Sequence, residues 1–114
     1  MTKPQKPQES EKTLEARLAR EIQARGGMAL KYTSQHHRGI PDRICLMPYG
    51  RTYFVELKST GKRPTKIQQH AIAQISALGF PAWVVDSTAS LERFLLTVDK
   101  DQGYFNPTFA QNAN

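Results

Sequence analysis

A short turn between two apolar runs constrains the fold of this chain more than any other feature. Residues 42–47 and 52–58 are rich in aliphatic and aromatic side chains, and Pro48, Tyr49 and Gly50 separate them. Proline at the first turn position and glycine at a left-handed position are typical of a three-residue loop with a type I turn and a G1 bulge. The sequence therefore predicts a β-hairpin with a defined register.

The register of this hairpin brings two carboxylates together. A loop of three residues pairs Ile44 with Phe54 and, two positions further along each strand, Asp42 with Glu56. Side chains that face each other across two strands lie roughly 5 Å apart, and like charges there are destabilising unless something compensates them. Because side chains alternate between the faces of a strand, Lys58 is expected on the same face as both acids. A divalent cation would compensate the paired carboxylates.

Phosphodiester hydrolysis is the chemistry that suits these groups. Carboxylate oxygens are preferred ligands of Mg²⁺ and Mn²⁺, and such a metal activates a water and neutralises transition-state charge. We expect Asp42, Glu56 and the backbone carbonyl of Leu57 to hold Mg²⁺ or Mn²⁺. Lys58 would position or deprotonate the attacking water, or stabilise developing charge. An isolated Glu-x-Lys pattern is more often a solvated ion pair on a strand, so these residues alone do not define the site.

The motif extends well beyond the carboxylates and the lysine. It comprises segments 39–42, 53–58 and 61–65 together with Gln68. In spacing and flanking residues these segments resemble the PD-(D/E)xK nuclease superfamily and, within it, stand-alone viral or bacterial members of the VRR-NUC family. The resemblance runs from about residue 15 to about residue 86. It implies a metal-dependent deoxyribonuclease of the α/β class, a single-domain restriction-endonuclease-like αβββαβ core with a mixed central sheet flanked by helices.

The resemblance also implies roles for individual residues. It assigns metal binding to Asp42 and Glu56, the catalytic lysine to Lys58, and supporting roles in catalysis to Glu15 and Gln68. The middle letter of the family's V-R-R signature is not present as such, which leaves these five positions unaffected.

The positions of Glu15 and Gln68 can also be explained by local helix structure, without a role in catalysis. Glu15 borders an apolar helix stripe, where an acid can simply be solvated or paired with Arg17 or Arg20. Thr65 and Gln68 have the spacing of a helix capping box. A single Gln68 side chain is not expected to serve the cap and the active site fully.

Positive charge is concentrated around the paired carboxylates. The chain has 16 Lys and Arg against 10 Asp and Glu, and residues 31–66 contain eight of these cations but only two acids, Asp42 and Glu56. A basic field of this kind attracts a polyanion such as DNA. A surface that is basic only for solubility would explain the total charge but not its clustering. DNA contacts are expected from Lys31, Arg38, Arg43, Lys62, Arg63 and Lys66.

Hydrophobic periodicity predicts three helices and two further strands around the hairpin. Helices are expected from Ser10 to about residue 25, from Thr65 to Leu78 and from about 87 or 90 to 96, with strands at 28–33 and 82–85. The unbroken apolar run at 82–85 indicates a strand covered on both faces, at or near the centre of the sheet. The predicted buried positions are Leu14, Leu18 and Ile22 in the first helix, and Ile67, Ala71, Ile75 and Leu78 in the second.

The predicted organisation is one domain at residues 10–98 between a disordered tail at 1–9 and a C-terminal tail at 99–114. In the second tail, Tyr104, Phe105 and Phe109 are expected to pack back or to contact a second subunit. The lone cysteine, Cys45, excludes an internal disulfide and is expected to be a core thiol. With no apolar run of membrane-spanning length and no signal peptide, a cytoplasmic location is expected.

Other classes of function are also compatible with these residues. A non-catalytic nucleic-acid-binding module would explain the basic centre but not its two acids. A metal-dependent phosphatase or nucleotide hydrolase would explain the acids, but the chain contains no P-loop motif. Stand-alone members of the family that the chain resembles look like homodimeric resolvases of four-way (Holliday) junctions, whereas fused members look like monomeric flap nucleases. The absence of a second domain favours a homodimeric junction resolvase, and a monomeric flap or nicking nuclease is the alternative.

Overall fold

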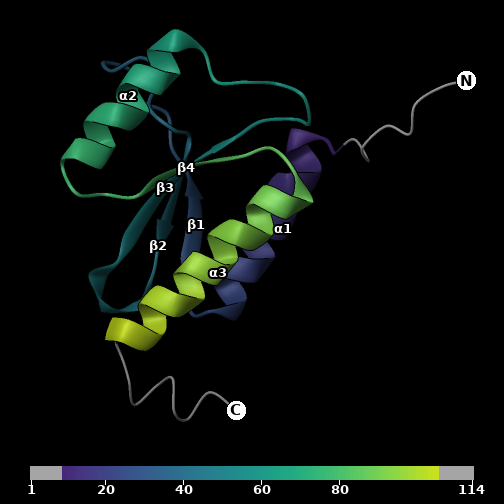
Figure 1. Cartoon of the computed structure of the whole chain (residues 1–114), viewed down its shortest axis with the longest axis vertical. Helices are drawn as coiled ribbons and strands as arrows, with labels where there is room; N and C mark the ends of the chain where they lie inside the picture. Colours follow the sequence, from purple (N-terminus) through teal and green to yellow (C-terminus); the bar gives the residue numbers. More distant parts are fainter. Residues whose placement is uncertain (1–8, 106–114) are drawn as a thin grey trace, which may run out of the picture.

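The computed structural model describes residues 9–105, which form one mixed sheet flanked by helices (Figure 1). The sheet order is β1-β2-β3-β4, with antiparallel pairing except for the parallel pair β3 and β4. This confirms the predicted αβββαβ core, followed by one more helix. Within the described residues, no helix is long and apolar enough to cross a membrane. The elements are α1 (Glu11–Ala24), β1 (Met28–Lys31), β2 (Arg43–Leu46), a 3₁₀ turn (Pro48–Gly50), β3 (Thr52–Leu57), α2 (Lys66–Ala77), β4 (Ala82–Val85) and α3 (Thr88–Phe105).

Helix α1 begins and buries its apolar stripe as the sequence predicts. The Ser10 hydroxyl accepts a hydrogen bond from the backbone N–H of Thr13, which satisfies one of the free donors at the helix start. The side chains of Leu14, Leu18 and Ile22 are almost completely buried. The helix therefore starts at a fixed residue and presents its acidic first turn at one end of the sheet.

The hairpin has the predicted register but a different turn. Ile44 pairs with Phe54 in the ladder between β2 and β3, and the Met47 N–H donates to the carbonyl of Arg51 at 2.8 Å. Gly50 has the expected positive φ of 73°, but Tyr49 also has a positive φ of 66°. A type I turn requires negative φ at both central positions, so the predicted turn type is wrong. The loop length alone preserves the register.

The two faces of the sheet are covered unequally. Tyr53, Val55 and Leu57 point into the main core, which α1 and α3 close from one side, as Figure 1 shows. The other face is covered by α2 near β4. On that face the side chains of Met28 and Leu30 remain exposed.

Strand β4 lies at the edge of the described sheet, so its predicted central position is wrong. Its first three residues are half-buried, and only Val85 is fully buried. Trp83 packs against the core with its ring centroid 5.6 Å from that of Phe94. An apolar run shows that both faces of a strand are covered, but it does not show whether both edges are paired.

Helix α2 is buried only along its middle. Ala71 and Ile75 are buried as predicted, whereas the side chains of Ile67 and Leu78 are 50% and 76% exposed. The prediction for the two end positions is wrong because α2 contacts the sheet chiefly at β4, so its ends extend past the apolar surface.

Helix α3 continues to Phe105, beyond the predicted end near residue 96. Buried polar contacts hold the extra turns: Arg51 donates to the carbonyl of Val98 at 3.3 Å and to the side chain of Gln102 at 3.0 Å. These contacts span about half the chain, so local periodicity could not reveal them. The aromatic side chains at 104, 105 and 109, which were expected to pack back or to contact a second subunit, lie outside the described side chains.

Candidate active site

The carboxyl end of β3 carries the centre of the site. Glu56 lies one position beyond the ladder pair Arg43–Val55, and the same register places Asp42 opposite it. The Glu56 side chain is only 7% exposed, and its Oε2 lies 3.7 Å from the Nζ of Lys58. Cys45 faces the opposite side of the sheet, where burial raises the pKa of its thiol to about 12. Asp42, Glu56 and Lys58 thus share one end of the sheet, and Cys45 is a core residue.

The Glu56 carboxyl group is held in an unfavourable environment for its charge. Its pKa is raised above the ordinary value of 4.5, first because burial removes it from water and second because the Asp42 carboxylate lies nearby. Lys58 opposes this shift, and the carboxylate of Glu11 adds to it. Glu11 was not among the site residues predicted from the sequence. Its position four residues before Glu15, on the same side of α1, is a signal that could have found it.

Arg43 is an internal counterion of the site. Its guanidinium lies 2.6 Å from Glu15 Oε2 and 2.7 Å from Asp42 Oδ2, and its side chain is 3% exposed. The expectation that Arg43 contacts DNA is therefore wrong, because burial and two carboxylate partners keep it from a phosphate. Glu15 acts on the site through Arg43, which ties α1 to the first residue of β2.

Gln68 contributes to both the helix cap and the site. Its side-chain oxygen accepts from the Thr65 N–H at 2.9 Å, and its own backbone N–H donates to the Thr65 hydroxyl, which completes the predicted capping box. Its Nε2 donates to Glu56 Oε2 at 3.2 Å. One side chain was not expected to serve the cap and the site fully, but the two ends of the amide face different partners and both contacts are made at once.

The donor set fits a hard divalent cation. Asp42 and Glu56 supply carboxylate oxygens, and Asp42 Oδ1 is buried with no hydrogen-bond partner among the described residues. The backbone carbonyl of Leu57, the third predicted ligand, belongs to the residue between Glu56 and Lys58. No group of three or more His, Cys, Asp or Glu side chains within residues 9–105 is arranged to hold a metal. Two carboxylates and a backbone carbonyl remain the predicted ligands.

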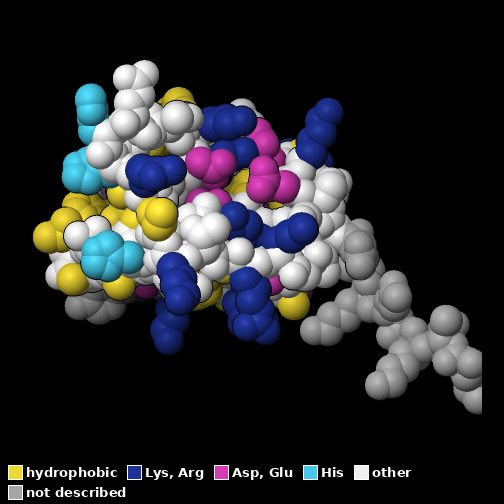
Figure 2. All heavy atoms as spheres, turned by 90° about the horizontal axis from the view of Figure 1, so that it is seen from above, with side chains coloured by type: hydrophobic (Ala, Val, Ile, Leu, Met, Phe, Trp, Pro, Cys, Tyr) yellow, Lys and Arg dark blue, Asp and Glu magenta, His cyan; other side chains and the backbone are white. Residues whose placement is uncertain are grey.

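Cationic side chains surround this acidic centre. Figure 2 shows Asp and Glu side chains gathered near the middle of this end of the molecule, with Lys and Arg side chains around them. The remaining predicted DNA contacts are all exposed and have no ion pair among the described residues. They are Lys31, Arg38, Lys62, Arg63 and Lys66.

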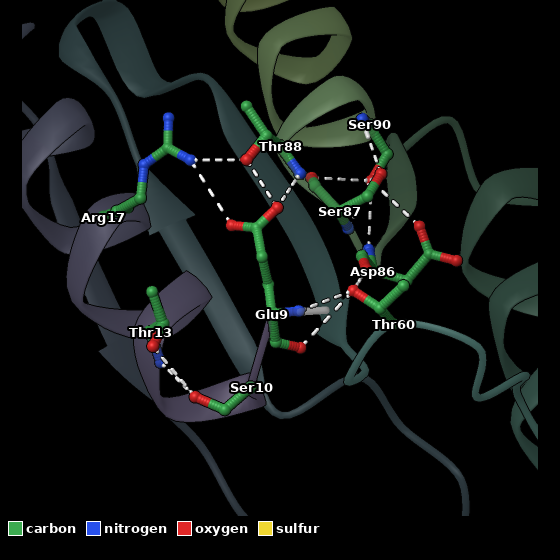
Figure 3. A network of polar contacts seen from close by, with 9 residues as sticks. All are labelled: Glu9, Ser10, Thr13, Arg17, Thr60, Asp86, Ser87, Thr88 and Ser90. Atoms are coloured by element: carbon green, nitrogen blue, oxygen red, sulfur yellow. Dashed lines mark hydrogen bonds and ion pairs between the residues drawn. The ribbon is translucent and has the colours of Figure 1, made fainter. Parts of the chain in front are cut away.

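A network of polar contacts fixes the segment that follows Lys58 (Figure 3). The Glu9 N–H donates to the Thr60 hydroxyl at 2.9 Å, and the Thr60 N–H donates to the Glu9 carbonyl at 3.1 Å. The Glu9 carboxylate accepts hydrogen bonds from Thr88 at the start of α3 and lies 3.6 Å from Arg17. We call Glu9, Arg17, Thr60 and Thr88 the N-terminal clasp. Glu9 was predicted to lie in a disordered tail, and the structure places it within the fold.

Comparison with known proteins identifies the fold first. No protein-family model matches the sequence. A solved structure described as "VRR_NUC domain" superimposes with a TM-score of 0.67 at 24% identity, over 76% of this chain and 96% of that one. The α/β fold described above is therefore that of a VRR-NUC domain.

Sequence similarity then identifies the family. The chain is 40% identical over 77 residues to "Putative nuclease p44" of Acyrthosiphon pisum secondary endosymbiont phage 1, covering 68% of this chain and 83% of the phage protein. Identity of this extent over most of both chains shows common descent. This relationship to a phage nuclease, together with the VRR-NUC fold, places the chain in the VRR-NUC family.

Proposed function

We propose that this protein is a divalent-metal-dependent DNA endonuclease that hydrolyses phosphodiester bonds. The observation that carries the proposal is the buried Glu56 carboxylate, which has Asp42 opposite it and both Lys58 and Gln68 near the same oxygen. A solvated ion pair on a strand does not require a buried carboxylate beside a second acid. The nuclease designation of the phage relative supports the same assignment.

Each residue has a distinct role in the proposed mechanism. Asp42, Glu56 and the Leu57 carbonyl would hold Mg²⁺ or Mn²⁺, which when bound supplies Lewis-acid activation of water and of the phosphate. Lys58 positions the attacking water or takes its proton. Gln68 fixes the orientation of the Glu56 carboxylate through its hydrogen bond. Glu15, through Arg43, fixes Asp42.

A lysine substitution tests the catalytic assignment. Lys58→Ala is expected to lower the rate of cleavage of a labelled DNA by roughly 100-fold or more, since it removes a group that acts on the attacking water. Binding of the same DNA should change little. Lys100→Ala, at an exposed lysine on α3, is the matched control. Undiminished cleavage by Lys58→Ala would remove the lysine from the mechanism.

The exposed cations allow a separate test of DNA binding. Lys62→Ala combined with Arg63→Ala is expected to weaken DNA binding and to lower the slope of log K against log salt by about one for each phosphate that is no longer neutralised. Cleavage at saturating DNA should persist, because neither residue belongs to the acidic centre. An unchanged salt slope would show that this loop does not contact phosphates.

We further propose that the protein acts as a homodimer on four-way junctions. Strand β1 forms a free edge of the described sheet, and Met28, Leu30 and Leu46 beside that edge are 59%, 40% and 40% exposed. A two-fold pair built on the part of this surface nearest the hairpin would bury apolar area, leave the Tyr32 end of β1 open and carry two cutting sites, which suits the symmetry of a junction.

Sedimentation and cleavage test the two parts of this proposal. A dimer has twice the chain mass of 12.9 kDa, and Leu30→Lys should return it to the monomer mass by placing charge at the interface. A monomer at micromolar concentration would contradict the dimer. Equal cleavage rates for a four-way junction and a linear duplex of the same sequence would contradict junction selectivity and would leave a general nicking or flap nuclease.

A further inference from the structure

An exposed tyrosine lies in the same row of the sheet as the two site carboxylates. The ladder between β1 and β2 pairs Lys31 with Arg43, and one position further the Tyr32 N–H donates to the Asp42 carbonyl at 2.7 Å. The ladder between β2 and β3 continues this row to Glu56. Residues that face each other across adjacent strands point to the same side of a sheet. The Tyr32 ring is therefore on the side that carries Asp42 and Glu56, next to Asp42.

The Tyr32 side chain has no polar or aromatic partner in the described part of the chain. It is 43% exposed, and within residues 9–105 its hydroxyl has no hydrogen-bond partner and its ring has no aromatic partner. The aromatic ring pairs found among the described residues lie elsewhere, in the core or between Phe54 and Phe80. Exposed aromatic surface has no structural benefit for the isolated molecule, because burying it would be favourable.

The surroundings of Tyr32 indicate what it contacts. Arg38, on the loop that leads from Tyr32 to Asp42, is an exposed cation, and strand alternation places Lys58 on the same side of the sheet as the ring. An aromatic ring beside cations that face a phosphate backbone is the arrangement by which proteins stack on nucleobases of single strands. In a continuous duplex each base is already stacked on its neighbours, so the ring can engage only a base that is unpaired or displaced.

We propose that Tyr32 is a specificity-determining residue that stacks on an unpaired nucleobase beside the phosphate to be cut. The preferred substrate then contains an unpaired or displaced nucleotide at the cleavage position, as in a single strand, a flap or an open branch point. This inference rests on the proposed nuclease function and deepens it. Tyr32 acts on the base and takes no part in the chemistry at phosphorus, which belongs to the acidic centre and Lys58.

A binding experiment that needs no cleavage tests the inference. The full chain carrying Lys58→Ala is titrated with short single-stranded oligonucleotides in which 2-aminopurine replaces each base in turn, and with the matching duplexes. Stacking should change the probe's fluorescence at one position, and this signal should survive Tyr32→Phe and disappear in Tyr32→Ala. Single-strand affinity should fall roughly 5- to 150-fold in Tyr32→Ala, the range for removal of one stacked base, while duplex affinity should fall less than about twofold.

Tyr49→Ala is the matched control, because Tyr49 is an exposed tyrosine on the hairpin at the opposite end of the sheet. It should leave both affinities and the probe signal unchanged. Equal losses for single strand and duplex in Tyr32→Ala, or a probe signal that persists without the ring, would overturn the inference. Cleavage of the same oligonucleotides by the unmodified chain is measured separately. A stacking signal without any cleavage would therefore reject the nuclease proposal and keep Tyr32 as a base contact.

Discussion

Gly39 shows how tightly the loop that leads to Asp42 rests on α2. A Cβ added at Gly39 would lie 2.6 Å from the carbonyl oxygen of Ile67, closer than real Cβ contacts, and Gly39 has a φ of +83°. The backbone in the first turn of α2 cannot shift without a cost in free energy, because the capping box at Thr65 holds it in place. This single position therefore couples the Asp42 loop to the helix that carries Gln68.

Gly39→Ala is expected to lower the free energy of unfolding by about 2 kcal/mol or more, since both the backbone conformation and the contact with Ile67 oppose a side chain. Gly61→Ala is the matched control. Gly61 has a φ of +89° but no atom within 4 Å of an added Cβ, so it should lose only about 1 kcal/mol from the backbone conformation. Urea denaturation measures both values. Equal losses at the two positions would show that the packing against Ile67 contributes nothing.

At the scale of single elements, the structural role of the α2 start can be separated from the catalytic role proposed for Gln68. Within residues 9–105 the Thr65 hydroxyl bonds only at the helix start, whereas the Gln68 amide bonds both there and to Glu56. The sequence pattern predicted the capping box, because its signal is local and has fixed spacing. The hydrogen bond to Glu56 depends on where α2 lies against β3, which local spacing does not show.

Gln68→Glu should keep the cap and damage the site, because a carboxylate can still accept the Thr65 N–H but places negative charge beside Glu56. With saturating Mg²⁺ to compensate the added charge, its melting temperature is expected to stay near that of the unmodified chain, while its cleavage rate falls at least about tenfold. Thr65→Ala should show the reverse, with a loss of about 1 kcal/mol in stability and nearly normal cleavage below the melting transition. Parallel losses of stability and activity in both variants would contradict a separate role of Gln68 at Glu56.

At the scale of the whole molecule, the buried acidic centre lowers the stability of the metal-free fold at neutral pH. Glu56 has a raised pKa, so the folded state binds its proton more tightly than the unfolded state does. Ionised Glu56 therefore destabilises the metal-free fold at neutral pH, and stability contributed by its protonation is gained as the pH falls through the raised pKa. Buried carboxylates of this kind are typical of sites that bind a cation.

Glu56→Gln is expected to raise the stability of the metal-free protein at neutral pH by about 1 kcal/mol, a shift of several degrees in melting temperature for a domain of this size, and to abolish cleavage. Mg²⁺ or Mn²⁺ should stabilise the unmodified chain but not Glu56→Gln, because binding to the folded state shifts the unfolding equilibrium. Thermal melts with and without the cation measure both effects. A Glu56→Gln variant that is less stable without metal would show that the carboxylate is structural.

The N-terminal clasp has the opposite dependence on pH. Hydrogen bonds from Thr88 hold the pKa of Glu9 below its ordinary value of 4.5, and nearby Arg17 acts in the same direction while burial opposes it. A carboxyl group with a depressed pKa contributes stability that is fully present above its unfolded pKa and is lost as the pH falls through its folded pKa. The clasp is therefore expected to weaken in acid.

Glu9→Gln should be less stable than the unmodified chain at pH 7, and the difference should shrink as the pH falls below about 4. Urea denaturation across this range measures it. Glu92→Gln, at an exposed glutamate on α3 without an ion pair in the described part of the chain, is the control and should show no such trend. A difference that does not vary with pH would mean that the Glu9 charge contributes nothing to the clasp.

The sequence by itself determined the elements and the centre of the site. The stripe of Leu14, Leu18 and Ile22, the capping box and the three-residue hairpin loop are local patterns, and each has one favourable conformation. The hairpin register followed from loop length, and it placed Asp42 opposite Glu56 even though the turn itself has a different conformation. Strand alternation then placed Lys58 on their side of the sheet.

Only the tertiary structure decided which charged side chains are buried in ion pairs and which are exposed. Arg43 and the exposed cations look alike in the sequence, but Arg43 is enclosed by Glu15 and Asp42 from different elements. Glu9 and Thr60 are 51 positions apart in the sequence but form a hydrogen bond. Strand β4 lies at the edge of the sheet because the crossover connection through α2 places it beside β3. The physical reason is the same in each case. Burial and long-range pairing depend on the packing of whole elements, and no local pattern encodes which elements will meet.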